Sequence, residues 1–178
     1  MTNAQGLVRK WTTLLNADVV GYSAMMSRNE LGTLYALLTN MRWLSRSVKA
    51  FGGRVIDSPG DNLLAEFGNE AAAVECALFV QQRVEERNSG IVPELQIRFR
   101  IGVHSGTLIE LRQRLYGEAV NVSARLQSVA DCGGVLVSSA TAERLPCEMS
   151  EAMLRNPRSF QLKHIPLPVT ALEARVSP

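Results

Sequence analysis

Two aspartates, Asp18 and Asp61, have the surroundings in this chain that best suit chemistry. Asp18 lies in Ala17–Ser23, at the end of an apolar run. Asp61 lies in Ser58–Asn62, whose composition is typical of a tight turn. If the fold brings the two carboxylates together, they form a site for a hard cation such as Mg²⁺, which usually takes one or two carboxylates and leaves room for phosphate oxygens. The pair therefore predicts phosphate-ester chemistry. Considered singly, each aspartate is also typical of an ordinary turn.

The hydrophobic pattern predicts the elements that position these residues. Strands are expected at Lys10–Val19, Arg54–Asp57, Asn62–Phe67, Leu95–Val103, Thr107–Leu111 and Val135–Ser138. Helices are expected at Asn29–Phe51, Glu70–Asn88, Ala119–Val129 and Ser139–Leu145. A last hairpin is expected between Phe160–Lys163 and Val169–Val176. The order β-α-β-β-α-β predicts an α+β fold, with a ferredoxin-like split βαβ core and a C-terminal α/β extension.

Two of the predicted helices have an apolar stripe. Along 29–51, residues recur at spacings of three and four that predict one face of a helix: Leu31, Leu34, Tyr35, Leu38, Met41, Leu44, Ser45 and Val48. Along 70–88, the predicted buried stripe consists of Ala73, Ala77, Val80, Gln81 and Val84.

Length and composition restrict the class of protein. The 178 residues suffice for one domain, which we place at 1–178 with a core at about 10–176. A net charge of +2 is too small to imply a nucleic-acid or membrane partner, and no run of about 18 apolar residues predicts membrane insertion. The N-terminus lacks a secretory pattern, and the three cysteines have no paired spacing. These features favour a reducing cytoplasm.

Five segments occur in a distinctive order: Ala17–Ser23, Gly52–Ile56, Gly60–Phe67, Arg98–Gly106 and Tyr116–Leu126. Together they resemble the class III nucleotidyl cyclases, and in particular bacterial adenylate/guanylate cyclase catalytic domains. The resemblance extends from about Leu14 to Val176. It implies a cyclase fold, similar to a polymerase palm, and a head-to-tail homodimer that binds ATP or GTP at its interface. It also implies two metal ions per site, Mg²⁺ or Mn²⁺, and attack of the 3′-hydroxyl on the α-phosphorus, which forms a 3′,5′-cyclic nucleotide and pyrophosphate.

The resemblance assigns metal and phosphate ligands near the first aspartate. Asp18 and Asp61 match the two metal aspartates, and the carbonyl of Val19 would complete the ligands. The backbone N–H groups of three residues would bind phosphates: Gly21, Tyr22 and Ser23.

The resemblance also assigns a transition-state pair. Asn121 and Arg125 lie four residues apart on one face of a predicted helix. Asn121 would orient the ribose, and Arg125 would meet the charge that builds on the α-phosphate. Without the other motifs, a solvated polar pair on an amphipathic helix would explain them as well. His104 follows a predicted strand, and we expect it to hold a turn without binding a ligand.

The chain departs from the family at the positions that select the base. Where adenylate cyclases commonly have a lysine and an aspartate or threonine, this chain has Asp57 and Arg114. The charges are thus reversed relative to a lysine–aspartate pair. Asp57 and Arg114 remain candidates for base recognition, but they do not predict which purine is bound. The basic segment between Gly106 and Tyr116 fits either a dimer contact that attracts triphosphate or a solvated hairpin.

Two functions therefore stay open. One is an active cyclase in intracellular signal transduction, since every catalytic residue type is present. The other is a catalytically silent cyclase-homology domain that serves dimerisation or nucleotide sensing, which the altered base-selecting pair favours. A diguanylate cyclase is disfavoured because the segment Gly-Gly-Asp-Glu-Phe is absent.

Overall fold

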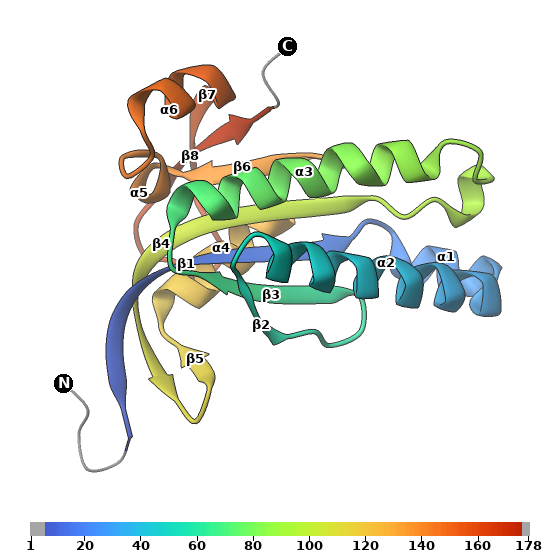
Figure 1. The fold of residues 1–178 in the computed structure, drawn as a ribbon, viewed down its shortest axis with the longest axis horizontal. Coiled ribbons are helices and arrows are strands. Elements are labelled where there is room, and N and C mark those ends of the chain that lie inside the picture. The colour runs from blue at the N-terminus through green and yellow to red at the C-terminus, as the bar shows by residue number, and fades with distance from the viewer. Residues whose placement is uncertain (1–5, 176–178) are drawn as a thin grey trace.

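The centre of the molecule is an antiparallel pair of long strands, β1 (Val8–Val19) and β4 (Phe99–Leu111). All twelve residues of β1 pair with β4, from Val8 opposite Glu110 to Val19 opposite Phe99. The computed structural model describes residues 6–175 and is drawn in Figure 1. Residue 176, at which the predicted last hairpin ends, lies outside the described residues.

The other strands extend this pair into one mixed sheet with the order β2-β3-β1-β4-β6-β8-β7, while β5 pairs only with β4. The pairing of β4 with β6 is parallel. The remaining strands are β2 (Arg54–Asp57), β3 (Asn62–Phe67), β5 (Arg114–Tyr116), β6 (Val135–Ser138), β7 (Leu154–Phe160) and β8 (Val169–Ala174). The predicted α+β class is confirmed.

Helices cover both faces of the sheet. They are α1 (Tyr22–Arg28), α2 (Glu30–Ala50), α3 (Glu70–Asn88), α4 (Glu118–Val129), α5 (Ser139–Ala142) and α6 (Cys147–Met153), and a 3₁₀ turn, η1 (Pro93–Leu95), precedes β4. In Figure 1, α2 and α3 lie in front of the sheet and α4 lies behind it. Alternation along β1 divides the core accordingly: Leu15 and Ala17 pack with α2 and α3, whereas Leu14 packs on the α4 side.

The structure corrects the prediction for the fourth strand. Thr107–Leu111 and most of Leu95–Val103 were expected to be separate strands, but β4 continues through Gly106, which pairs with Thr12. A Cβ at Gly106 would lie 3.0 Å from Ala119 Cβ, so the glycine lets α4 approach the strand and does not end it. His104 consequently lies in mid-strand and not at a turn, and the prediction that it holds a turn is wrong.

The end of the chain also differs from the prediction. The last hairpin forms between β7 and β8, so its first strand is Leu154–Phe160 and not Phe160–Lys163. This strand is polar, exposed and interrupted by a register shift between Arg155 and Arg158, where Pro157 lies. Proline at a bulge of an edge strand is compatible with pairing, but it conceals the strand from pattern analysis. Helices α1 and α6 were not predicted either, because seven residues give too little periodicity.

Helix α2 has nearly the predicted bounds, and Asn29 caps it by accepting a hydrogen bond from the N–H of Gly32 at 2.9 Å. The predicted stripe is confirmed at Met41, Leu44 and Val48 but is wrong for the first half of the helix. The buried residues are Thr33, Leu37, Met41, Leu44, Ser47 and Val48, whereas Leu31, Leu34, Tyr35 and Leu38 are exposed. The stripe of α3 is confirmed at Ala73, Ala77, Val80 and Val84.

A ring of alternating charges ties four strands together on the α4 side of the sheet. Lys10 contacts Glu66 and Glu110 at 2.6 Å each, and Arg54 contacts the same two carboxylates at 2.6 and 2.8 Å. Burial raises the pKa of Glu66, but the hydrogen bonds from Lys10 and Arg54 outweigh that effect and lower it overall. The ring fixes the relative positions of β2, β3, β1 and β4.

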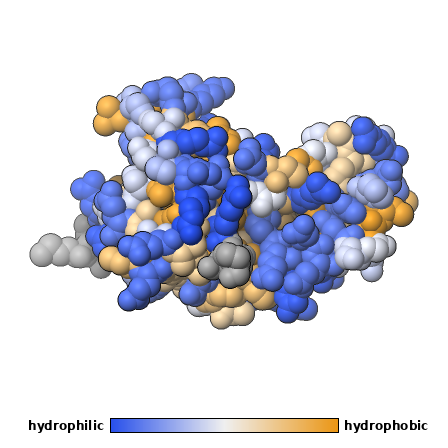
Figure 2. Space-filling model, turned by 90° about the horizontal axis from the view of Figure 1, so that it is seen from above, coloured by the Kyte–Doolittle hydropathy of each residue, from blue (hydrophilic) through white to orange (hydrophobic). Residues whose placement is uncertain are grey.

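The outer surface is mainly hydrophilic where Figure 2 shows it, with scattered hydrophobic residues. Within residues 6–175, none of the helices is both long enough and apolar enough to cross a membrane.

Candidate active site

The fold brings the two predicted metal aspartates to the same end of neighbouring strands. Asp18 is the penultimate residue of β1 and pairs with Asn62, the first residue of β3. The N–H of Val19 donates to the carbonyl of Asp61 at 3.1 Å, so the segments that carry the two aspartates are hydrogen-bonded to each other. The arrangement expected from the sequence is thus present in the backbone.

The turn that carries Asp61 is held from two sides. Gly60 has φ = 63°, a left-handed conformation that glycine adopts readily, and the N–H of Asn62 closes the turn on the carbonyl of Pro59 at 3.2 Å. The amide of Asn62 also donates to Asn16 on β1 at 2.9 Å. Residues next to each aspartate therefore fix the distance between β1 and the turn.

The electrostatics of this corner favour a cation. Burial raises the pKa of the Asp61 carboxyl, and the carboxylate of Asp18 raises it further, while a hydrogen bond from its own backbone and the charge of Arg100 oppose the rise. Two carboxylates close enough to repel each other are stabilised by a bound cation. Among residues 6–175 no group of three or more acidic, histidine or cysteine side chains could hold a metal, so this corner offers two carboxylates and backbone carbonyls.

Arg100 is a residue of this corner that the sequence analysis missed. Its guanidinium donates to Asp18 at 2.9 Å and to the carbonyl of Ser128, at the end of α4, at 3.3 Å. Its Nε is buried without a hydrogen-bond partner. Arg100 lies between Phe99 and Ile101, which are both buried, so the alternation along β4 puts it on the opposite side of the strand from these two residues. That it faces Asp18 follows only from the pairing of β1 with β4.

The predicted phosphate-binding residues lie directly after Asp18. Gly21 has φ = 71° and ψ = 19°, and α1 begins at Tyr22. No side chain caps this helix, and Ser23 and Gly21 are exposed. The first N–H groups of α1 are therefore left for other acceptors.

Asn121 and Arg125 lie on α4, on the side that faces away from the sheet. The buried side of α4 consists of Ala119, Val122, Ser123, Leu126 and Gln127, while Asn121 is exposed and Arg125 is partly exposed. Within residues 6–175, neither side chain has a hydrogen bond or ion pair with Asp18 or Asp61. The structure thus does not join the two halves of the predicted site within one chain.

The candidate base-selecting residues are both exposed, and they lie on strands that do not pair with each other. Asp57 ends the edge strand β2, where its Oδ1 accepts a hydrogen bond from the N–H of Ser58 at 2.9 Å. Arg114 begins β5 and pairs with Leu111. Within residues 6–175, no hydrogen bond or ion pair joins their side chains.

Comparison with known proteins now decides the family. The model of the adenylate and guanylate cyclase catalytic domain matches residues 9–164. The chain belongs to the class III nucleotidyl cyclases. The crystal structure of an adenylate/guanylate cyclase/hydrolase from Silicibacter pomeroyi superposes on this cyclase domain with a TM-score of 0.84 and 28% sequence identity, covering 95% of this chain and 98% of that chain.

Curated relatives agree with this assignment. The cyclase domain is 37% identical to a Rhizobium meliloti protein over 142 residues, which are 78% of this chain and 24% of that protein. It is 32% identical to an adenylate cyclase of Streptomyces coelicolor over 130 residues, which are 72% of this chain and 32% of that enzyme. The chain thus spans about a quarter of the length of the first relative and about a third of the second.

Proposed function

We propose that this domain converts ATP or GTP into a 3′,5′-cyclic nucleotide and pyrophosphate. The observation that carries the proposal is the hydrogen-bonded junction between Val19 and Asp61, which holds two family-matched aspartates side by side. We regard residues from about 10 to 176 as one catalytic domain. The family includes adenylate and guanylate cyclases, so either ATP or GTP fits as the substrate. The Streptomyces relative is an adenylate cyclase, which favours ATP.

The donor set fits Mg²⁺ or Mn²⁺, which prefer oxygen ligands. Asp18, Asp61 and the carbonyl of Val19 would hold the metal, two ions per site, with phosphate oxygens completing the ligands. Burial and, to a smaller extent, the Asp18 carboxylate raise the pKa of Asp61, and such a cation would relieve the repulsion between the two carboxylates. When bound, the metal would lower the pKa of the attacking hydroxyl and neutralise charge on the phosphates.

The remaining groups would bind and orient the substrate. The N–H groups at Gly21, Tyr22 and Ser23 would receive phosphate oxygens, because no side chain caps the start of α1. Asn121 would orient the ribose, and Arg125 would stabilise the charge that develops on the α-phosphate as the 3′-oxygen attacks and pyrophosphate leaves. Asp57 and Arg114 would contact the base edge, where Asp57 can accept a hydrogen bond and Arg114 can donate one.

A homodimer would complete the site. Asn121 and Arg125 face away from the sheet that carries Asp18 and Asp61, so a second chain is needed to place them over these aspartates. Each dimer would then contain two sites, each with metal ligands from one chain and the Asn–Arg pair from the other. The three cysteines are free, and we place this activity in a reducing cytoplasm.

A silent domain is the second candidate, and the reversed charges at Asp57 and Arg114 favour it. Product analysis separates the two. Concentrated protein is incubated with ATP or GTP, each with Mg²⁺ and with Mn²⁺, and products are resolved by chromatography. A cyclic product that is absent from Asp18→Ala supports the cyclase. No cyclic product under any condition, with nucleotide binding retained in a titration, supports the silent domain.

A further inference from the structure

Helix α2 presents an apolar patch that is not covered by any described part of the chain. Leu31 is 79% exposed and Tyr35 77%, and Leu34 and Leu38 are 39% and 48% exposed. These residues follow one another at spacings of three and four, so they form a continuous stripe along two turns. Contiguous exposed apolar side chains on a helix usually mark a contact surface.

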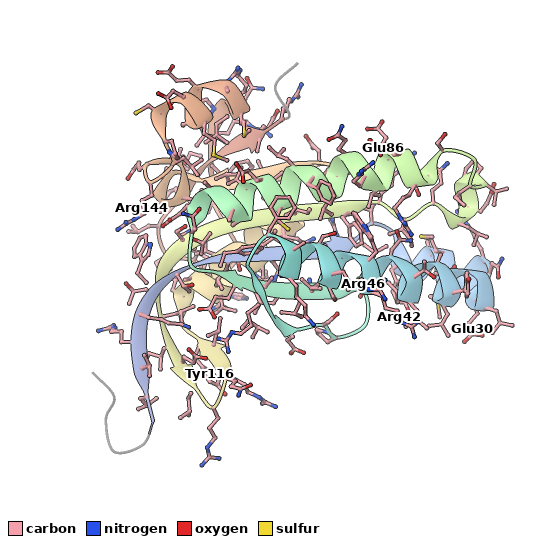
Figure 3. The ribbon with its side chains drawn as sticks, in the orientation of Figure 1. Glu30, Arg42, Arg46, Glu86, Tyr116 and Arg144 are labelled. Atoms are coloured by element: carbon pink, nitrogen blue, oxygen red, sulfur yellow. The ribbon has the colours of Figure 1, made fainter. Side chains whose placement is uncertain are left out.

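Charges of opposite sign flank the patch along the helix. Glu30 precedes it, and Arg42 follows one turn beyond Leu38. Neither side chain forms an ion pair or hydrogen bond within residues 6–175. Figure 3 shows the labelled Glu30, Arg42 and Arg46 along the lower edge of α2, pointing away from the body of the molecule. Twelve residues separate Glu30 from Arg42, which is about 18 Å along a helix.

A shallow groove lies beside the second half of the same helix. Ser58 of the β2–β3 turn lines it, together with residues of α2: Leu38, Met41, Arg42, Ser45, Arg46 and Lys49. Protruding leucine and tyrosine side chains thus occupy the first half of α2, and a groove with Leu38 and Met41 beside three basic side chains occupies the second half.

We propose that α2 pairs antiparallel with α2 of a second copy of this chain, around a two-fold axis at the level of Ala36. In this register Leu34 packs against the partner's Leu38, and Leu31 enters the groove at the partner's Met41. Glu30 meets the partner's Arg42, and the symmetry repeats each contact. Acidic and basic ends that exchange partners are the self-complementarity that a two-fold interface requires.

Charge complementarity favours a second copy of this chain as the occupant of this surface. The groove is basic through Arg42, Arg46 and Lys49, and the two-fold pairing brings Glu30 to the partner's Arg42 at this basic end. The patch is also distinct from the surface that the proposed catalytic dimer uses. Helix α2 packs on the face of the sheet opposite to α4, so both contacts can form in one assembly. This inference goes beyond the proposed cyclase activity and does not depend on it.

The contact area of one helix stripe is small compared with the roughly 800 Å² per partner of a stable interface. We therefore expect association only at concentrations of roughly 100 µM and above, measured by sedimentation equilibrium. Leu31→Ser should weaken it at least fivefold. The matched control is Leu167→Ser, since Leu167 is 75% exposed in the loop between β7 and β8, at the edge of the sheet opposite to β2, and it should leave association unchanged.

Charge reversal tests the register. Glu30→Lys and Arg42→Glu should each weaken association, and the double variant should restore it, because each swapped lysine then meets the partner's swapped glutamate. Thermal unfolding of each variant checks that α2 still folds. If the double variant associates no better than the single variants, the proposed register is wrong.

Disulfide trapping tests the contact directly and separates it from the catalytic dimer. The exposed Cys132 and Cys147 are first replaced by serine. In that background Tyr35→Cys, next to the axis, should form a disulfide-linked dimer on mild oxidation. Arg46→Cys is the control, because its distance from the axis keeps the two copies of residue 46 far apart. Failure of Tyr35→Cys to cross-link at 500 µM, or Leu31-dependent binding to phosphatidylserine vesicles without self-association, would overturn the proposal.

Discussion

At the scale of single residues, the ionised carboxyl of Asp61 lies in a place that is unfavourable for its charge but suited to binding a cation. Its carboxyl is partly buried and lies near Asp18, and both effects raise its pKa, with burial the larger. A raised pKa means that the ionised form costs stability at neutral pH in the absence of a cation. Sites that bind metal commonly combine such repulsion with a geometry that the backbone fixes.

We therefore expect Asp61→Asn to keep or raise the melting temperature of the metal-free protein. Its free energy of unfolding should increase by less than about 1 kcal/mol. Mn²⁺ should raise the melting temperature of the wild type but not of this variant. Calorimetry with and without Mn²⁺ measures both effects. A metal-dependent rise that survives in Asp61→Asn would contradict the metal assignment.

His104 shows a different use of a titratable residue. Its Nδ1 lies 2.8 Å from the hydroxyl of Ser138, and that hydroxyl continues to Thr141 at 3.1 Å. Thr141 in turn is hydrogen-bonded to Ser105 at 3.0 Å, and Ser105 is hydrogen-bonded to Thr13 at 2.9 Å. Burial lowers the pKa of His104 to about 4. The neutral ring thus belongs to a network that joins β1, β4, β6 and α5.

The lowered pKa of His104 predicts acid sensitivity. Between pH 6.5 and about 4 the unfolded chain binds a proton at this histidine and the folded chain does not, so stability falls as the pH falls. The loss attributable to His104 should reach roughly 2–4 kcal/mol at pH 4. His104→Gln, which can still hydrogen-bond to Ser138, should show a smaller loss in urea unfolding. Parallel pH profiles for the two proteins would contradict this account.

At the scale of elements, the backbone of α4 packs closely against Gly102 of the sheet. A Cβ at Gly102 would lie 2.4 Å from the backbone nitrogen of Gln127 and 2.5 Å from the carbonyl of Ser123. Backbone atoms of a helix cannot give way as a flexible side chain can. Any side chain at residue 102 must therefore push α4, and with it Asn121 and Arg125, away from the sheet.

Gly102→Ala should consequently destabilise the fold by about 1–3 kcal/mol and lower turnover more than nucleotide affinity. Gly68→Ala is the matched control, since Gly68 has open space around it and an ordinary φ. Urea unfolding and steady-state kinetics compare the two. Equal behaviour of the two variants would show that α4 does not rest on Gly102 as described.

At the scale of the whole molecule, the proposed site requires two chains. Asp18→Ala and Arg125→Ala should each be nearly inactive, because each homodimer lacks one half of both sites. Mixed together, they should regain partial activity, up to about a quarter of the wild-type level, since half of the dimers in a random mixture are heterodimers with one intact site. Activity assays of the mixture at constant total protein measure the gain. A verified heterodimer without activity would argue against a shared site.

The accuracy of the predicted secondary structure differs along the chain. Helix α3 and strands β2, β3 and β6 were predicted nearly to the residue, because their hydrophobic periodicity and turn residues agree. Strand β7 was misplaced because its edge position permits polar residues and a proline at a bulge. In α2, two overlapping series of apolar residues share the helical spacing, and only packing selects which of them is buried.

By itself, the sequence determined the family, the order of the main elements and the residues proposed for metal, phosphate and ribose. The motifs consist of residue types at short, fixed spacings, and such local features can be seen directly in the sequence. Only the tertiary structure decided that Arg100 contacts Asp18, that Asn121 and Arg125 face away from the sheet, and that the first half of the apolar stripe of α2 is exposed. These facts depend on which strands pair and how each helix is rotated on the sheet. Both are set by contacts between residues far apart in the chain, which local patterns do not record.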